Sequence, residues 1–301
     1  MSPTMDALVT FISSRYPELQ GESFRIVTEG MQNTVIIVGE RLVFRFPLSS
    51  DSVSLETEKR FLPKLAERVT LPIPKILFES DSQDDLQYIG YPIIQGEPLM
   101  DVHFLSLSET VKDRIAKEIA DFLTSLHTFQ DDPVTRNDPD ESRVTWKGGW
   151  EFFFAEIERF VEPKLGKNER LWVQRMRREY LQTDGSFEFT PCLIHGDFKR
   201  EHIFYDPDAE RLSGIIDFGQ LKVGDPAYDF HYLHLNYGER FMNSVYLYYL
   251  GPKDDNFHSR IEIYTYFLWL SELLYAARMN DVPVWNRGAA WLSSIASRTY
   301  S

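Results

Sequence analysis

Two short stretches of sequence decide the fold: LIHGDFKREHIF at residues 193–204 and GIIDFG at residues 214–219. Each is an apolar, strand-like run that leads into charged residues. Asp197, His202 and Asp217 can therefore converge on one spot. Phosphoryl transfer needs such a group of side chains, because one carboxylate orients the attacking hydroxyl while others hold the metal ion that neutralises the phosphates.

The chain upstream of these stretches predicts a small antiparallel sheet. Short runs rich in β-branched and aromatic residues read as strands; they are FRIV (24–27), TVIIV (34–38), LVFRF (42–46), KILFES (75–80) and YIGYPII (88–94). One helix is expected before them, and another at residues 54–69. Beyond Gly96 the apolar residues recur at helical spacing, first over residues 107–129 and then over most of the chain after Tyr228.

Composition and charge exclude several classes of protein. The 301 residues are 43% hydrophobic and carry a formal charge of −14, which is typical of a globular chain that binds nucleic acid poorly and can attract a cationic ligand. The single cysteine, Cys192, excludes an internal disulfide and a cysteine zinc site. We find neither a signal-peptide pattern nor an apolar stretch long enough to span a membrane, and expect a cytoplasmic protein with no nucleic-acid or membrane partner.

The ordered motifs resemble the protein-kinase-like superfamily, in particular the aminoglycoside phosphotransferases and the related macrolide phosphotransferases. The resemblance extends over nearly the whole chain, through EGMQNTV (29–35), LVFRFP (42–47), LPIP (71–74), YPIIQGEPL (91–99), the two central stretches and GDPAYDF (224–230). It implies an α+β, two-lobed kinase-like fold. The expected parts are an antiparallel-sheet nucleotide-binding lobe (1–93), a hinge (94–99) and a larger, mostly helical catalytic and substrate-binding lobe (100–301).

The resemblance also implies roles for residues of the central stretches. Asp197 matches the catalytic aspartate, and Asp217 matches the principal Mg²⁺ ligand. His202 stands where the superfamily usually has a metal-binding asparagine, so it is a second candidate ligand. Lys199 matches a lysine that contacts the γ-phosphate in many protein kinases, with a solvated surface lysine as the alternative. Asp229 resembles the helix aspartate that supports the catalytic loop.

The nucleotide site implied by the resemblance departs from the usual pattern. Arg45 takes the place of the lysine that pairs with the α- and β-phosphates, and arginine can do this with its planar, always charged fork. Its expected helix partner is Glu58, with Glu56 as the alternative. The resemblance further places Gly30 in the nucleotide loop; Tyr91, as gatekeeper, and Ile94, in the hinge, are assigned to the nucleotide site. A tyrosine gatekeeper favours GTP over ATP as the phosphoryl donor, with Mg²⁺ as the metal.

The acceptor is expected to be a small molecule. Only five residues separate Gly219 from Asp225, which leaves no room for the peptide platform of a protein kinase. Aminoglycosides are polycations, so acidic side chains are candidates to bind them; these are Glu239, Asp254, Asp255 and, best matched to the family, Glu272. A macrolide would instead suit an apolar pocket lined by aromatic residues; the candidates are Tyr232, Tyr237, Tyr264, Trp269, Tyr275 and Trp285.

We therefore predict a kinase that phosphorylates a hydroxyl of an aminoglycoside antibiotic, with a macrolide 2′-phosphotransferase as the alternative. Two further readings stay open. One is a metabolic small-molecule kinase. The other is a nucleotide-binding pseudokinase, motivated by the unusual Arg45 and His202 and opposed by the presence of both Asp197 and Asp217.

Overall fold

The computed structural model describes residues 4–27, 33–48, 53–81, 83–136, 138–182 and 186–300. The chain forms two compact units, one of residues 1–126 and 200–221 and the other of residues 127–199 and 222–301. Each unit is thus built from two separate stretches of sequence. The lobe boundary at residues 94–99 stays a prediction.

The first unit contains a five-stranded antiparallel sheet in the order β1-β2-β3-β5-β4. Its strands are β1 (Phe24–Val27), β2 (Asn33–Val38), β3 (Leu42–Pro47), β4 (Phe78–Glu79) and β5 (Ile89–Pro92). All five overlap the predicted runs, although β2 and β3 each extend one residue beyond theirs and β4 is much shorter than KILFES. The antiparallel sheet expected from the sequence is confirmed.

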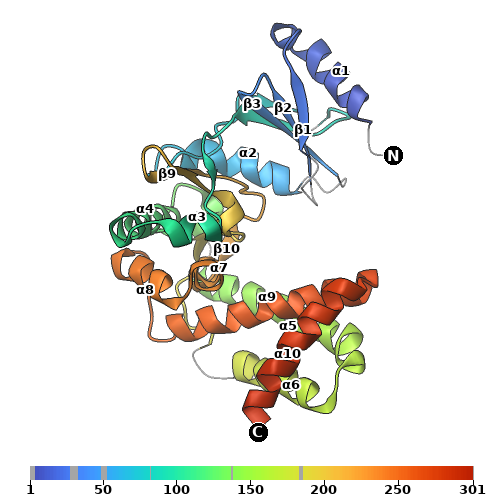
Figure 1. Cartoon of the computed structure of the whole chain (residues 1–301), viewed down its shortest axis with the longest axis vertical. Helices are drawn as coiled ribbons and strands as arrows, with labels where there is room; N and C mark the ends of the chain where they lie inside the picture. Colours follow the sequence, from blue (N-terminus) through green and yellow to red (C-terminus); the bar gives the residue numbers. More distant parts are fainter. Residues whose placement is uncertain are drawn as a thin grey trace. The chain divides into compact units, whose positions relative to one another are not determined.

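Two helices cover opposite faces of this sheet (Figure 1). Successive side chains of a strand point to opposite faces, so β3 contributes to both. Phe44 packs in a cluster with Leu8 of α1 (Met5–Arg15), whereas Val43 packs in a cluster with Leu55 of α2 (Val53–Leu65). Arg45 follows Val43 by two residues, and the same alternation turns it toward α2.

A second, three-stranded sheet of the first unit has the order β6-β8-β9. Its elements and their neighbours are β6 (Glu97–Pro98), α3 (Asp101–Ser106), α4 (Glu109–His127), the short 3₁₀ turn η4 (Arg200–His202), β8 (Ile203–Asp206) and β9 (Arg211–Ile215). The Ile216 amide donates to the carbonyl of His202 at 3.0 Å. The β8–β9 hairpin therefore brings the end of η4 beside the residue that precedes Asp217.

The second unit is mostly helical. Its elements are η2 (Pro133–Arg136), α5 (Pro139–Phe160), η3 (Glu162–Lys164), α6 (Lys167–Gln182), β7 (Cys192–Ile194), β10 (Lys222–Gly224), α7 (Ala227–Tyr237), α8 (Glu239–Tyr248), α9 (Phe257–Met279) and α10 (Val282–Tyr300). Rings of Trp150, Tyr180 and Phe267 pack together between α5, α6 and α9. The antiparallel pair β7 and β10 places Lys222 opposite Ile194, three residues before Asp197. Among the described helices, none is long and apolar enough to cross a membrane.

Candidate active site

A buried ion-pair network in the first unit contains Arg45, the residue predicted to bind phosphates. Arg45 donates from Nη1 to both carboxylate oxygens of Glu58, at 3.0 and 2.8 Å, and from Nη2 to Oδ1 of Asp217 at 2.8 Å. Glu56, the alternative partner, is exposed and pairs with Lys59 instead. Glu58 is therefore the partner of Arg45.

One guanidinium binds two carboxylates in this network. The pKa values of Glu58 and Tyr91, which both lie beside it, are shifted. Burial raises the pKa of Glu58 to about 7; Asp217 adds to the rise as a like charge, while Arg45 opposes it. Burial likewise raises the pKa of Tyr91 to about 12, against the pull of the nearby Arg45. Tyr91 thus lies beside Arg45 as a neutral phenol at physiological pH.

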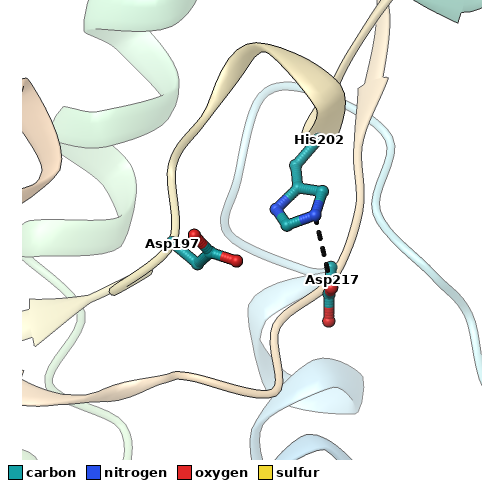
Figure 2. Close-up of side chains that lie close together, drawn as sticks. All are labelled: Asp197, His202 and Asp217. Carbon is teal, nitrogen blue, oxygen red and sulfur yellow. Dashed lines mark ion pairs between the residues drawn. The ribbon is translucent and has the colours of Figure 1, made fainter. Parts of the chain in front are cut away.

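Asp217 has a backbone conformation that few side chains adopt. Its φ is +64°, in the left-handed region, where a residue other than glycine stores strain that often accompanies function. Its Oδ2 lies 3.3 Å from Nε2 of the buried His202 (Figure 2), while its Oδ1 binds Arg45. The two oxygens thus have different partners, Arg45 for Oδ1 and His202 for Oδ2.

The loop from residue 195 to residue 202 carries the remaining polar groups. Asp197, His202 and Asp217 each offer one ligand atom, and these atoms lie within 4.8 Å of one another (Figure 2). Carboxylate oxygens suit Mg²⁺, and an imidazole nitrogen is a softer third donor. This donor set fits a divalent metal ion. Lys199 forms an ion pair with Asp197 at 2.9 Å, so the predicted lysine does lie beside the predicted base.

Asp229 of α7 holds the start of this loop through the backbone. Its carboxylate accepts from the amides of His195 at 2.8 Å and Gly196 at 2.9 Å. His195 in turn accepts from the Asp197 amide at 3.3 Å through Nδ1. These contacts fix the backbone on which Asp197 stands, as expected for the helix aspartate and for an architectural His195.

Asp229 is fully buried, and yet its pKa is lowered. Burial alone would raise it, but the bond to His127, the nearby charge of His195 and the Gly196 amide together outweigh burial. His127 Nε2 lies 3.0 Å from Asp229, and its Nδ1 lies 2.7 Å from the Tyr249 hydroxyl. The carboxylate that supports the loop is therefore held ionised by His127 of α4 and by His195 and Gly196 of the loop itself.

Residues 23–252, most of the chain, match the model of the phosphotransferase enzyme family known as APH. The chain belongs to this family. It is an enzyme that transfers a phosphoryl group to an alcohol. Among curated relatives, viomycin phosphotransferase of Streptomyces vinaceus is 27% identical over 212 residues, which are 69% of this chain and 71% of that protein.

Solved structures of this phosphotransferase family share the fold over almost the full length. An aminoglycoside 2″-phosphotransferase in complex with GDP and kanamycin matches with a TM-score of 0.85 and 27% identity, covering 97% of this chain and 98% of that one. A macrolide 2′-phosphotransferase from Brachybacterium faecium matches with a TM-score of 0.73 at 20% identity, covering 96% and 98%. The α+β, kinase-like fold expected from the sequence is confirmed.

The other predicted nucleotide contacts of the phosphotransferase have different outcomes. Gly30 lies outside the described residues. Tyr91 is buried beside Arg45, and its role as gatekeeper stays a prediction. The Ile94 side chain lines a cavity of about 290 Å³ together with Pro72, Ile73 and Ser213, so a role for Ile94 in nucleotide binding stays a prediction.

The predicted acceptor-binding residues are scattered over the second unit. Glu239 is exposed as the first residue of α8, and Glu272 is half-buried on α9. Trp285 on α10 lies beneath the ammonium of Lys164. Tyr264 does not line a pocket, because it is buried in the aromatic core and bonds Asp225 at 2.7 Å. Its hydroxyl is needed there to satisfy a buried carboxylate.

Sequence reasoning missed two sets of residues that support the site by hydrogen bonds and ion pairs. His127 and Tyr249 lie at helix ends far from any motif, and only the folded chain brings His127 to Asp229 and the Tyr249 hydroxyl to His127. Asp225 forms a buried ion pair with Arg260, which also binds Asp254 at 2.7 Å. Asp254, considered as an acceptor-binding acid, is therefore engaged in holding the start of α9.

Proposed function

We propose that this phosphotransferase transfers the γ-phosphoryl group of GTP or ATP, with Mg²⁺, to a hydroxyl of an aminoglycoside antibiotic. The main support is the convergence of Asp197, His202 and Asp217 within 4.8 Å. The likeness to an aminoglycoside 2″-phosphotransferase solved with GDP and kanamycin supports the acceptor class. A cytoplasmic location, where nucleoside triphosphates are available, accompanies this proposal.

Each polar residue has a distinct task in this mechanism. Asp197 accepts a hydrogen bond from the acceptor hydroxyl and takes up its proton as the oxygen attacks the γ-phosphorus; the bond from the γ-phosphorus to the β,γ-bridging oxygen breaks, and GDP or ADP leaves. Asp217 and His202 would hold the metal ion, which neutralises charge on the β- and γ-phosphates. Arg45, oriented by Glu58, binds phosphate oxygens with the fixed geometry of a guanidinium. Lys199 pairs with Asp197 at 2.9 Å, and its proposed role is to contact the γ-phosphoryl group during transfer.

The choice of donor rests on Tyr91. Its buried phenol, at the position that the family resemblance assigns to the gatekeeper, would block the deeper position that adenine takes and favour the shallower one of guanine. The solved structures offer both donors as precedents, since one aminoglycoside 2″-phosphotransferase was solved with ADP and others with GDP. We therefore propose GTP as the preferred donor, with ATP as the second.

A macrolide is the second candidate acceptor. Arg45, buried at the position of the kinase lysine, is also typical of macrolide phosphotransferases. Trp285 is partly exposed on α10 and offers an aromatic surface for a bulky apolar acceptor. Glu272, also on the helical unit, serves the cationic acceptor instead.

The test is a coupled assay of GDP or ADP release with purified protein and Mg²⁺. GTP and ATP are each combined with a kanamycin-class aminoglycoside, a macrolide or no acceptor. We expect turnover that depends on the aminoglycoside. Asp197→Ala should lower kcat at least about hundredfold, the scale of lost general-base catalysis, while leaving the nucleotide-induced thermal shift unchanged.

The matched control is Asp208→Ala, which removes an exposed carboxylate outside the site and should leave kcat unchanged. Wild-type rates in Asp197→Ala would contradict its role as the base. A nucleotide-induced thermal shift with no turnover on any acceptor would contradict the proposed substrate class and favour a metabolic acceptor or a pseudokinase.

A further inference from the structure

A cavity of about 290 Å³ lies within the first unit of the chain. Its walls come from the segment between α2 and β4, from residues 92–95 at and after the end of β5, and from Ser213 of β9. Neither Arg45 nor its partners Glu58 and Asp217 line it. The volume is at the lower end of the range for small-molecule sites, about 300–1,000 Å³.

Strand β5 separates this cavity from the ion-pair network of Arg45. Tyr91 packs with Val43 in the cluster that faces α2, on the side of the sheet toward which Arg45 is turned. Successive residues of a strand point to opposite faces, so Pro92, the next residue of β5, points away from that side. Pro92 lines the cavity, whereas Tyr91 does not. The cavity is therefore distinct from the site described above.

Two close approaches of the backbone hold the walls of the cavity together. The Ile215 amide donates to the carbonyl of Pro72 at 2.9 Å, which ties the segment before β4 to β9. Gly214 permits this contact, because a Cβ there would lie 2.7 Å from the Pro72 oxygen. Gly96, with a φ of +106°, passes equally close to Ser213, since a Cβ there would lie 2.5 Å from the Ser213 hydroxyl oxygen. The three segments thus form one connected wall.

The polar groups of this cavity suit an anion with an apolar body. The Ser213 hydroxyl oxygen is buried and has no hydrogen-bond partner among the described residues, which is unfavourable for a hydroxyl. Lys75 is exposed and is the one charged side chain among the described residues that line the cavity. Prolines and isoleucines form most of the remaining wall. The cavity therefore combines a positive charge and an unpaired hydroxyl with an apolar surface.

We propose that this cavity binds a small carboxylate with an apolar body, of the size of a two-ring aromatic acid. The apolar body lies against Pro72, Pro92 and the neighbouring isoleucines, where its surface is removed from water. The carboxylate accepts a hydrogen bond from the Ser213 hydroxyl and is attracted by the Lys75 ammonium. A single cation favours such a monoanion over a phosphate dianion. The ligand takes no part in phosphoryl transfer, so this site does not depend on the proposed function.

The test titrates 2-naphthoate into the full chain and follows its binding by ligand-observed NMR. We expect saturable binding that Ser213→Ala weakens roughly tenfold, the scale of a hydrogen bond to a charged group. Lys75→Met should weaken it about threefold, the scale of an exposed ion pair, and should not change the binding of uncharged 2-naphthamide. The matched control is Lys117→Met, which removes an exposed ammonium of α4 outside the cavity and should leave the affinity unchanged.

Saturating GDP with Mg²⁺, whose own binding is followed by thermal shift, separates the cavity from the nucleotide site. Naphthoate should bind with the same affinity in their presence. Displacement by GDP would place naphthoate in the nucleotide site and overturn the proposal. The absence of saturable binding, or equal affinities in wild type, Ser213→Ala and Lys75→Met, would overturn it as well. The measurement needs no turnover, so each of these results is independent of the acceptor that the enzyme phosphorylates.

Discussion

Two carboxylates of the molecule are both 0% exposed, yet their surroundings shift their pKa values in opposite directions. The pKa of Glu58, in the first unit, is raised to about 7, whereas that of Asp229, in the second, is lowered. Glu58 has one cation, which it shares with Asp217. Asp229 has two backbone amides and the ring of His127 to itself.

The difference shows that burial does not by itself decide the charge of a carboxylate. Hydrogen-bond donors that no other acid competes for can outweigh desolvation, whereas one guanidinium divided between two acids does not. The arrangement also fits the proposed tasks. Asp229 supports a loop and is held ionised, while Arg45, Glu58 and Asp217 form the network proposed to meet the nucleotide and the metal ion.

The largest effect is expected from breaking the Asp229 support. Asp229→Ala leaves the amides of His195 and Gly196 and the His127 ring without their acceptor. We expect the free energy of unfolding to fall by about 3–5 kcal/mol, as for a broken buried network. We also expect kcat to fall at least about hundredfold in the protein that remains folded, because Asp197 is no longer held in place. Urea unfolding and steady-state assays measure the two effects.

Asp225→Asn is the matched control for that variant. Asp225 is also 0% exposed, but it bonds Arg260 and Tyr264 rather than the catalytic loop. It should reduce stability with a much smaller fall in kcat per folded molecule. Equal losses of kcat in the two variants would refute a specific role for Asp229 in placing the loop.

A smaller effect is expected at Arg45, the cation that Glu58 and Asp217 share. Glu58→Gln removes a charged acceptor from Arg45, which then bonds Asp217 alone. The KM for the nucleotide should rise roughly tenfold, in line with about 1.5 kcal/mol for one charge-assisted hydrogen bond, because the guanidinium is no longer aimed at the phosphates. Nucleotide titrations at saturating acceptor measure this change. Glu56→Gln, on the same helix but exposed, should leave the KM unchanged, and a similar rise in both variants would argue against the pairing.

The smallest effect is on the pH dependence of stability. Because the pKa of Glu58 is raised from 4.5 to about 7, the folded state holds a proton that the unfolded state releases within this window. Stability from this group is therefore greatest below pH 4.5 and is lost as the pH rises toward 7. Asp229 acts in the opposite sense, since its contribution is present above pH 3.8 and is lost only as the pH falls below it.

Urea unfolding at pH 5, 6, 7 and 8 without metal ion tests this difference. Between pH 5 and pH 8 the wild type should lose on the order of 2 kcal/mol of stability relative to Glu58→Gln. Glu56→Gln should keep the wild-type slope. Parallel curves for the wild type and Glu58→Gln would show that Arg45 keeps Glu58 ionised throughout this range.

The sequence by itself determined the fold class. It also predicted that Asp197, His202 and Asp217 would come together. Runs such as LVFRF, rich in β-branched and aromatic residues, predicted strands, and the order of the motifs predicted which acids would serve phosphoryl transfer; that α1 and α2 cover the two faces of the sheet came from the structure. The pairing of Arg45 with Glu58 was implied by the family resemblance, with Glu56 as the alternative, and the structure decides it in favour of Glu58.

Only the tertiary structure decided which of the remaining polar groups support the site. His127, Tyr249 and Asp229 come from three separate helical segments, and Lys222 meets Trp146 from another strand. The sequence left Tyr264 open between a pocket and the core, with the core favoured for most of these aromatic residues; the structure buries it, and its hydroxyl donates to Asp225. The physical reason is that helical spacing specifies which face of a helix is apolar, whereas the partner of each polar group on that face is set by how the helices pack.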